Sequence, residues 1–426
     1  MKIIIVGAGL GGLSAGIALK QAGHDVIVLE AAHEIAEVGA GIQILPNASK
    51  ILTEFGLRPI LEKFAGSPKM CYINGWKGNT ITGLDFEKQG EVMGSPFWDF
   101  HRADLHGGML QKFKELGGET IVNCRIDDIL YDESKLEATA ISSTGERYIA
   151  DLIVGADGVN SKLRELLVGH SDPPTRTGDL AFRILIKTED AMKYPELADF
   201  VNNPQVNYWI GPQCHCVNYV IKQKQFINFV LLCPDTVPEG MNISPASVEE
   251  IKNIFKDWDE RLLKMMDLVD NKTIYKWRLC FRPGIESWYH ENGMFCLLGD
   301  SVHATLPYLA SGAGMCIEDG CVLGHLLKMY PDKRDLKTAL KIYQACRKDR
   351  TERIVSRGNL QQYLYHLDDG EEQEERDRIL RLPDPPAGEA FVWRDKELAP
   401  WLLKYDAMKD IQDKIFALKS GSALHV

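Results

Sequence analysis

Three glycines near the start of the chain have the spacing of a phosphate-binding turn. Gly7, Gly9 and Gly12 form a G-x-G-x-x-G pattern directly after a β-branched run at residues 3–6, and an apolar-periodic helix follows them. In such a turn the first glycine permits a tight bend, the second admits a pyrophosphate close to the backbone, and the third lets the helix pack on the strand. The helix N-terminus offers N–H groups and partial positive charge to the phosphates. The pattern therefore predicts a dinucleotide ligand.

A carboxylate follows at the distance expected for ribose binding. Residues 25–29 are expected to form a second strand that ends in Glu30, about 20 residues after the glycines, where its side chain can accept hydrogen bonds from both ribose hydroxyls. A carboxylate there favours an unphosphorylated 2′-hydroxyl, so FAD or NAD is preferred over NADP. The alternative is a βαβ unit in which the glycines serve only packing.

Two further segments repeat the sequence of buried strand, sharp turn and acid. Asp157 and Gly158 follow an apolar run at 152–156, and Gly299 and Asp300 follow another at 294–298. In a doubly wound sheet the ends of such strands gather at one edge, where a ligand crosses the switch point. Either turn alone could be an ordinary β-turn. Three turns converging on one long ligand favour FAD over a nicotinamide dinucleotide.

The elements that must position these turns change in kind along the chain. Residues 179–233 contain long β-rich stretches with no helix expected between them, which predicts an antiparallel sheet. Four strand-like runs within residues 120–150 predict a small antiparallel meander. A capping box at Ser247 and Glu250 starts a helix that is expected to continue to Leu262.

The C-terminal third is expected to be mostly helical. Long helices are predicted at 312–329 and 336–364, and one or two closing helices at 397–418. The charged run at 368–378 is expected to be a solvated helix or loop. The predicted fold class is α/β: a Rossmann-like dinucleotide-binding domain with an inserted antiparallel β-sheet substrate domain and C-terminal helices. The expected domains are a discontinuous FAD-binding domain (1–70, 99–178 and 285–365), a substrate-binding sheet domain (71–98 and 179–284) and a helical or linker region (366–426).

Composition excludes several function classes. The net charge of −11 and the lack of a basic block argue against nucleic-acid binding and against an anionic membrane surface. No segment approaches the roughly 20 apolar residues of a membrane span. The 10 cysteines show no disulfide framework, so reduced thiols and a cytoplasmic location are expected. A monomer or homodimer is expected.

Three motifs in order give the chain a family resemblance. VGAGLGGL, LIVGADGVNSKLR and FCLLGDSVHATLPYLASGAGM resemble the dinucleotide fingerprint, the DG motif and the GD motif of single-component FAD-dependent aromatic hydroxylases of the para-hydroxybenzoate hydroxylase type. Within these group A flavoprotein monooxygenases, the chain is most similar to the salicylate hydroxylase-like branch found widely in fungi. The resemblance covers nearly the whole chain. It departs from the family where GDAAHP and QG are common, since Ala304 follows His303 and Ser311 precedes Gly312.

The resemblance implies roles for particular residues. Asp300 would hydrogen-bond the ribityl chain, Pro307 would lie beside the flavin ring, and Arg102 would reach the ribityl or phosphate groups. The segment GIQILPNA would pass over the flavin, with Gln43 in contact. The full set of candidate cofactor residues is Gly7, Gly9, Leu10, Gly12, Glu30, Gly41, Gln43, Arg102, Asp157, Asp300, Gly312, Ala313, Gly314 and Met315.

The reaction that the resemblance implies uses NAD(P)H and O2. Hydride passes to FAD, reduced flavin reacts with oxygen, and a flavin C4a-hydroperoxide transfers one oxygen atom to an electron-rich aromatic or phenolic small molecule. The hydroxylation can proceed with or without loss of CO2 from the substrate. Epoxidation or dearomatisation of a secondary-metabolite scaffold would use the same intermediate. A non-enzymatic alternative is an FAD- or NAD-binding redox sensor. A halogenase is disfavoured because its W-x-W-x-I-P motif is absent from the sequence.

Candidates for catalysis lie in the predicted substrate sheet and beside the flavin: Arg183, Tyr208, His215 and Pro307. Arg183 stands in an otherwise apolar strand, where a substrate carboxylate or phenolate could be its partner; a salt bridge or an edge position explains it equally well. His215 resembles the histidine of a Gly-Pro-x-x-His pattern in this branch, although a structural hydrogen bond is the more common role of a strand histidine. No metal site is predicted, because Cys214 and Cys216 would face away from His215 on a strand.

Overall fold

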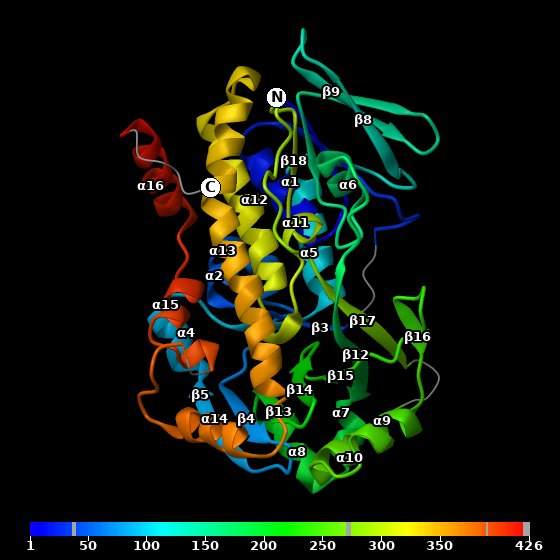
Figure 1. Cartoon of the computed structure of the whole chain (residues 1–426), viewed down its shortest axis with the longest axis vertical. Helices are drawn as coiled ribbons and strands as arrows, with labels where there is room; N and C mark the ends of the chain where they lie inside the picture. The colour runs from blue at the N-terminus through cyan, green and yellow to red at the C-terminus, as the bar shows by residue number, and fades with distance from the viewer. Residues whose placement is uncertain (36–39, 270–273, 389–390, 421–426) are drawn as a thin grey trace.

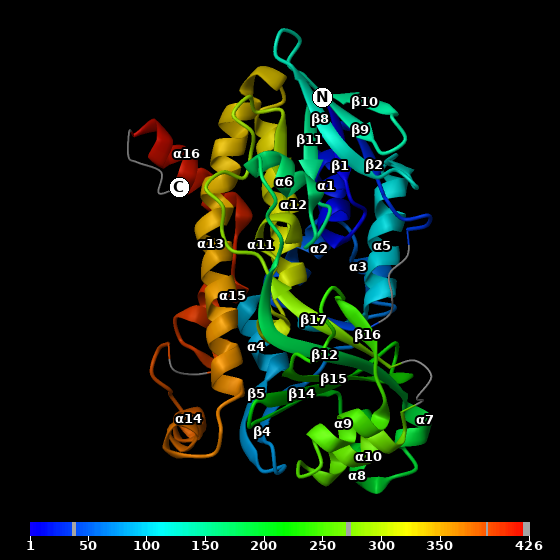
Figure 2. The ribbon, with the colours of Figure 1, turned by 45° about the vertical axis from the view of Figure 1, so that its right-hand side comes forward.

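The computed structural model describes residues 1–35, 40–269, 274–388 and 391–420. A parallel sheet with helices around it forms one half of the molecule, and a large sheet covered by short helices forms the other (Figure 1). The long helix α13 (Leu336–Tyr365) runs from the first half to the second, as the turned view shows (Figure 2). The predicted α/β class with a Rossmann-like part and a second sheet is confirmed.

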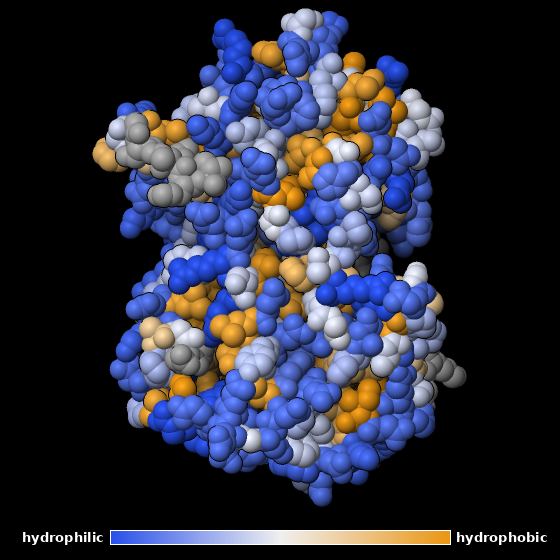
Figure 3. Space-filling view, in the orientation of Figure 1, coloured by the Kyte–Doolittle hydropathy of each residue, from blue (hydrophilic) through white to orange (hydrophobic). Residues whose placement is uncertain are grey.

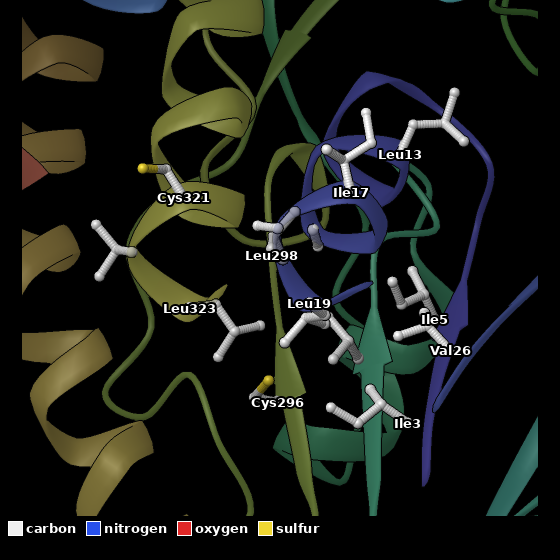
Figure 4. Packing of buried hydrophobic residues seen from close by; sticks show 14 of the residues in the cluster. Ile3, Ile5, Leu13, Ile17, Leu19, Val26, Cys296, Leu298, Cys321 and Leu323 are labelled. Carbon is white, nitrogen blue, oxygen red and sulfur yellow. The ribbon is translucent and has the colours of Figure 1, made fainter. Parts of the chain in front are cut away.

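The first half is built on a five-stranded parallel sheet whose central strands are buried on both faces. Ile3, Ile4 and Ile5 are fully buried, as expected for a β-branched run in the centre of a parallel sheet. Helix α1 (Leu10–Gln21) packs on this sheet through Leu19, while Leu13 and Ile17 lie on its other side within the same core cluster (Figure 4). The strand order is β18 (Phe295–Leu297), β11 (Leu152–Gly155), β1 (Lys2–Val6), β2 (Asp25–Leu29) and β7 (Glu119–Ile121).

Helix α12 (Gly312–Met329) lies unusually close to α1. A Cβ atom at Gly320 would lie 2.5 Å from the Ala15 nitrogen, and one at Gly324 would lie 2.4 Å from the Ala18 Cβ. Larger residues at these two positions would push the helices apart. Their close approach brings the N-terminal ends of both helices to the same edge of the parallel sheet.

The small meander has three strands rather than four. Strands β8 (Ile126–Asp132), β9 (Glu137–Ser142) and β10 (Arg147–Ala150) pair antiparallel. The first of the four predicted runs instead becomes β7, which pairs parallel with β2 from Ile27 to Leu29. Its assignment to the meander was wrong because pairing with the main sheet satisfies its backbone groups.

The second half is built on an eight-stranded sheet that is antiparallel except between β13 and β4. More than a hundred residues separate these two strands in the chain, so no hairpin forces them to run in opposite directions. The strand order is β16 (Ile243–Pro245), β17 (Tyr275–Phe281), β12 (Thr175–Lys187), β15 (Phe226–Pro234), β14 (Cys214–Ile221), β13 (Gln205–Gly211), β4 (Met70–Gly75) and β5 (Thr80–Asp85).

Short helices cover one face of this sheet. The expectation of no helix between strands in 179–233 was wrong, since α7 (Thr188–Ala191) and α8 (Pro195–Asn202) connect β12 to β13. The helix predicted from Ser247 begins there as α9 (Val248–Ile254), but Asp259 caps a separate helix, α10 (Glu260–Asp267). Their apolar residues form one core cluster with Trp209, Cys214 and Cys216.

The remaining elements lie within the two halves or follow α13. The charged run forms helix α14, in which Arg376 and Asp377 are buried. None of the described helices is long and apolar enough to cross a bilayer. Hydrophilic side chains dominate the face in Figure 3, with apolar ones in separate patches. The other bounds are β3 (Gly41–Ile44), β6 (Trp98–His101), α2 (Pro46–Glu54), α3 (Arg58–Leu61), α4 (Phe86–Met93), α5 (Arg102–Glu115), α6 (Lys162–Val168), α11 (Asp300–His303), η2 (Pro307–Leu309), η3 (Lys333–Asp335), α14 (Glu371–Arg381), η4 (Val392–Arg394), α15 (Leu398–Leu403) and α16 (Ala407–Lys419).

Candidate active site

A cavity of about 550 Å³ lies between the two halves of the molecule. One wall, which we call the strand-end wall, consists of the loops that follow β1, β11 and β18 together with the start of α12. The other, which we call the sheet wall, is the face of the eight-stranded sheet that the short helices leave uncovered. The two walls differ in their chemistry, because backbone groups dominate the first and side chains the second.

The three predicted turns meet at the strand-end wall. Gly9, Ala156 and Gly299 all line the cavity. The first two turns touch each other, since a Cβ at Gly7, where φ is +108°, would lie 2.2 Å from the carbonyl oxygen of Ala156. A Cβ at Gly12 would lie 2.0 Å from the carbonyl oxygen of Gly7. These glycines hold the turns together, and a side chain at either would part them.

Gly9 differs from its two neighbours in the motif. A Cβ built there meets no atom within 4 Å, and the same is true at Gly158. Open space at these two positions borders the cavity. The wall therefore offers bare backbone to a ligand, as the glycine pattern predicts.

Two helix N-termini point their free N–H groups at this space. Gly9 precedes α1 and Ser311 precedes α12, and neither makes a side-chain cap. Leu10, Gly312 and Ala313 line the cavity, as does Arg102 at the start of α5. Uncapped N–H groups, aligned peptide dipoles and an arginine favour an anionic ligand. Because they are spread along one wall, the ligand they fit is long.

The predicted cofactor residues divide into two groups. Those that line the cavity are Gly9, Leu10, Gly41, Gln43, Arg102, Asp300, Gly312 and Ala313. Those that lie outside the lining are Gly7, Gly12, Glu30, Asp157, Gly314 and Met315.

The members of the second group contact protein atoms. Glu30 accepts hydrogen bonds from the backbone N–H groups of Ala8 (2.8 Å) and Ala32 (2.9 Å). Asp157 accepts one from the hydroxyl of Ser161 at 2.5 Å and another from the N–H of Leu163 at 3.0 Å, so its carboxylate organises the start of α6. Its neighbours Ala156 and Gly158, and not its own side chain, face the cavity.

The register of the eight-stranded sheet creates the sheet wall. Arg183 pairs with Val230, Val230 with Val217, and Val217 with Tyr208, so these side chains form one row across four strands. The next row contains Ala181, Leu232 and His215. All seven residues line the cavity. The wall is therefore apolar with two basic side chains and a phenol set into it.

Arg183 occupies an interior strand of the sheet rather than an edge. Strand β12 lies between β15 and β17, and the guanidinium carbon of Arg183 is 5.8 Å from the centre of the Trp277 ring. Tyr219 also lines the cavity; burial raises its pKa well above 10, and the charge of Arg183 opposes that rise. Arg183 thus places a permanent positive charge on the sheet wall.

His215 projects into the cavity side of β14, whereas Cys214 and Cys216 join the core under the short helices. Its Nδ1 lies 2.7 Å from Nε2 of His366, and its ring packs edge-on against Tyr308 and Tyr365. Burial lowers the pKa of His215 well below 6.5. The imidazole is neutral at pH 7, and Nε2 is the nitrogen left for a ligand.

Tyr208 links the sheet wall to strands β3 and β6 through hydrogen bonds. Its hydroxyl donates to Oε1 of Gln43 (3.3 Å), and Nε2 of Gln43 donates to the carboxyl group of Asp99 (3.2 Å). Burial raises the pKa of Asp99 to about 8, although the Gln43 bond opposes the rise. Pro307 begins the turn η2 and also lines the cavity.

Comparison with known proteins decides the family. Residues 1–358 match the family described as "FAD binding domain". The FAD-dependent monooxygenase OpS4 of Beauveria bassiana is 38% identical over 414 residues, covering 96% of each chain. A 3-hydroxybenzoate 6-hydroxylase of Polaromonas naphthalenivorans is 32% identical and covers 86% of this chain and 88% of its own. The chain belongs to the FAD binding domain family.

As a member of this family, the chain is an FAD-dependent monooxygenase, as the sequence predicts. A crystal structure of CtdE in complex with FAD and a substrate has a TM-score of 0.84 and 18% identity, covering 99% of both chains, which shows the shared fold. The strand-end wall fits FAD: its open glycine positions, two uncapped helix N-termini and Arg102 suit a pyrophosphate, and Asp300 can accept hydrogen bonds from sugar hydroxyls.

A buried charge cluster under the strand-end wall was missed by the sequence analysis. Asp319 in α12 accepts hydrogen bonds from the Gly299 N–H (2.9 Å) and Nε2 of His303 (2.6 Å), and Arg347 of α13 donates to it at 2.7 Å. Burial alone would raise the pKa of Asp319, but His303 and Arg347 lower it to about 2. The signal was present, since Glu318 and Asp319 interrupt an apolar helix. This flavoprotein uses the cluster to fix the turn that carries Asp300.

Proposed function

We propose that this monooxygenase hydroxylates a phenolic or carboxylated aromatic small molecule with NAD(P)H and O2. The observation that carries the proposal is the sheet wall, where Arg183 and His215 stand among Val217, Val230 and Leu232 and face the strand-end wall. A flat apolar ring fits such a surface, and its acidic substituents fit the two basic side chains. By its name, the Polaromonas relative acts on 3-hydroxybenzoate, a compound of this class.

On the strand-end wall, the residues that would hold FAD are those that line it. Gly9, Leu10, Gly312 and Ala313 would donate backbone N–H groups to its phosphates, assisted by Arg102; Asp300 would accept from the ribityl hydroxyls, and Pro307 would lie beside the ring. Gly7, Gly12, Glu30, Asp157, Gly314 and Met315 would support them. When bound, FAD supplies hydride acceptance from NAD(P)H and activation of O2.

On the sheet wall, Arg183 would bind a carboxylate or phenolate of the substrate and fix its orientation. Nε2 of His215 would accept the proton of a phenolic hydroxyl, which makes the ring more electron-rich and more reactive toward an electrophilic oxygen. The valine and leucine side chains would keep water from the reacting atoms. Tyr208, through Gln43, would hold β3 against the sheet wall.

The division of labour follows the predicted domains. We assign cofactor binding to 1–70, 99–178 and 285–365, substrate binding to 71–98 and 179–284, and a supporting role to 366–426. All ten cysteines carry free thiols, which supports a cytoplasmic location. A monomer or homodimer stays a prediction, and light scattering would measure it.

A panel of aromatic acids and phenols tests the proposal. NAD(P)H oxidation, O2 uptake and product mass are followed together under ¹⁸O2. We expect at least one compound to stimulate oxidation and to gain one labelled oxygen atom; an accompanying loss of CO2 would identify decarboxylative hydroxylation. A labelled epoxide or dearomatised product would show that the enzyme catalyses epoxidation or dearomatisation instead of hydroxylation. FAD binding without stimulated turnover by any aromatic compound would contradict the proposal and favour a redox sensor.

Matched arginine variants locate the substrate. We expect Arg183→Met to retain FAD and to raise KM for an acidic substrate about 10²-fold, since hydrogen bonds between charged groups contribute about 1.5–3 kcal/mol each. Arg176→Met removes an exposed arginine from the same strand, where it pairs with Glu239, and serves as the control with unchanged KM. Equal KM values for the two variants would show that Arg183 does not bind substrate.

A further inference from the structure

Two largely buried side chains, His366 and Asp179, form a row with His215. His366 follows the last turn of α13, and its Nε2 lies 2.7 Å from Nδ1 of His215. On the far side of His366, its Nδ1 lies 3.5 Å from a carboxylate oxygen of Asp179 in β12. The three groups form a row that begins at the cavity lining with His215.

The chain holds this row firmly. The carbonyl oxygen of His366 accepts the N–H of Gln213 in the β13–β14 hairpin at 3.0 Å. The same Asp179 oxygen accepts hydrogen bonds from the hydroxyl of Tyr308 (2.5 Å) and from Nε2 of Gln362 (2.7 Å). Burial raises the pKa of this carboxyl group, and the two donors oppose that rise by stabilising the ionised form.

With both rings neutral, the short contact between them allows two proton arrangements. If His366 donated through Nε2, its Nδ1 would present a lone pair to the carboxylate of Asp179, which is repulsive. If His215 donates through Nδ1, then neutral His366 carries its proton on Nδ1, facing the carboxylate. The second arrangement satisfies every contact. It leaves Nε2 of His215 as a bare lone pair on the cavity side.

We infer that His366 and Asp179 are positioning residues that make His215 a base toward the cavity and accept the proton it takes from the substrate. The inference rests on the proposed function, since it concerns a phenolic substrate bound at the sheet wall. It gives a functional role to His366 and Asp179, neither of which is among the residues proposed to bind FAD.

The transfer balances without any redox change. The phenolic O–H bond breaks and an Nε2–H bond forms on His215, while its Nδ1–H bond breaks and an Nε2–H bond forms on His366. His215 ends neutral, and the positive charge rests on His366 beside the carboxylate of Asp179. The substrate is left as a phenolate.

The surroundings explain why the relay is needed. Burial lowers the pKa of His215 well below 6.5, and it lowers the pKa of His366 to about 4. The other titratable groups around the row are Tyr308 and Tyr365 against His215, and Cys214, Cys233 and Asp235 near Asp179. The phenols and thiols are neutral at pH 7, so Asp179 is the near anion that can balance a protonated His366. Without Asp179, His366 would not hold the transferred proton.

Nitrogen NMR of histidine-labelled holoprotein tests the tautomer without any turnover. We expect Nε2 of His215 to be unprotonated and Nδ1 protonated at pH 7.5. His366→Phe should shift His215 to the Nε2–H form, and His366→Gln, whose amide oxygen still accepts from Nδ1, should keep the native form. His290→Gln, a histidine that stacks on Tyr131 far from the cavity, is the control. A native His215 protonated on Nε2 would overturn the inference.

The pH profile tests the transfer, with any substrate that the aromatic panel identifies. The native rate should be flat from pH 6.5 to 8.5, while His366→Phe should lose about 10²-fold at pH 7 and recover as pH approaches the pKa of the free phenol. His366→Gln should fall between them. An equal loss at every pH would mean a packing role only. If His366→Phe lost FAD absorbance, Asp179→Asn would be measured instead, with the same recovery expected. If no compound of the aromatic panel stimulated turnover, the proposed function would be refuted. The NMR measurement would still decide the tautomer of His215, because it does not depend on turnover.

Discussion

The two walls of the cavity are built by different means. The strand-end wall consists of three turns and two helix ends, each specified by residues adjacent in the chain. The sheet wall consists of side chains from four strands, and which of them share a row depends on register. The difference teaches that a cofactor surface made of backbone is encoded locally, whereas a substrate surface made of side chains is encoded by pairing over long distances.

The largest expected effect separates two glycines of the strand-end wall. Gly12→Ala places a Cβ 2.0 Å from the Gly7 carbonyl oxygen, so we expect it to lower the free energy of unfolding by about 3 kcal/mol and to abolish FAD binding. Gly9 has a φ of −69°, which alanine can adopt, and the Cβ added by Gly9→Ala would meet no atom within 4 Å. We expect it to fold normally in the absence of FAD and to bind FAD poorly.

Thermal unfolding and flavin absorbance of the purified apoproteins measure both glycine variants. Equal unfolding temperatures for Gly9→Ala and Gly12→Ala would break the distinction between a glycine that packs and a glycine that faces ligand.

The next effect tests whether buried charges, and not backbone alone, support the strand-end wall. Arg347→Met removes the 2.7 Å partner that the fully buried Glu318 and Asp319 share, although Arg350 still pairs with Glu318. Removing one member of a buried ion pair costs about 3–5 kcal/mol. We expect that loss in urea unfolding, whereas Arg176→Met should change stability by less than about 0.5 kcal/mol. A small loss in Arg347→Met would show that the cluster is dispensable.

Asp99, beside Gln43, gives a pH dependence with a definite sign. The folded pKa of about 8 exceeds the ordinary value of 3.8, so the folded chain holds a proton that the unfolded chain releases. The carboxyl group therefore destabilises the fold increasingly as pH rises from about 4 to about 8. Asp99→Asn removes this effect and should stabilise the protein by about 1–4 kcal/mol at pH 8 and negligibly below pH 4. A variant that is less stable than the native protein at pH 8 would contradict the assignment.

The smallest effect concerns the hydrogen bond that joins the sheet wall to β3. Tyr208→Phe removes a neutral bond to Gln43, and such a bond contributes about 0.5–1.5 kcal/mol. We expect a stability loss of that size and less than a tenfold change in turnover. A loss of about a thousandfold in turnover would instead make Tyr208 an acid–base residue and would extend the chemistry of the sheet wall.

Sequence reasoning succeeded where structure is local. The strand before Gly7, the helix at α12 and the meeting of three turns at one edge all follow from contiguous patterns. It failed where a segment could pair with either of two sheets, as β7 did, and where an apolar stretch with a good cap, Ser247, contained a second cap at Asp259.

The candidate site divides in the same way. The sequence predicts Gly9, Asp300 and Arg102 by motif, and the structure places all three at the cavity. It could name His215 but not His366, because 151 positions separate them and no local pattern records their contact. Asp157 shows the converse: its motif is local, yet its side chain serves α6 and only its neighbours line the cavity.

A crystal structure with FAD and a phenolic acid selected by the panel tests the central claim most directly. The account predicts phosphates against Gly9 and the start of α12, the flavin ring near Pro307, and the acid against the row of Arg183 and the row of His215. A substrate bound away from the sheet wall, or a flavin whose phosphates avoid Gly9, would contradict it.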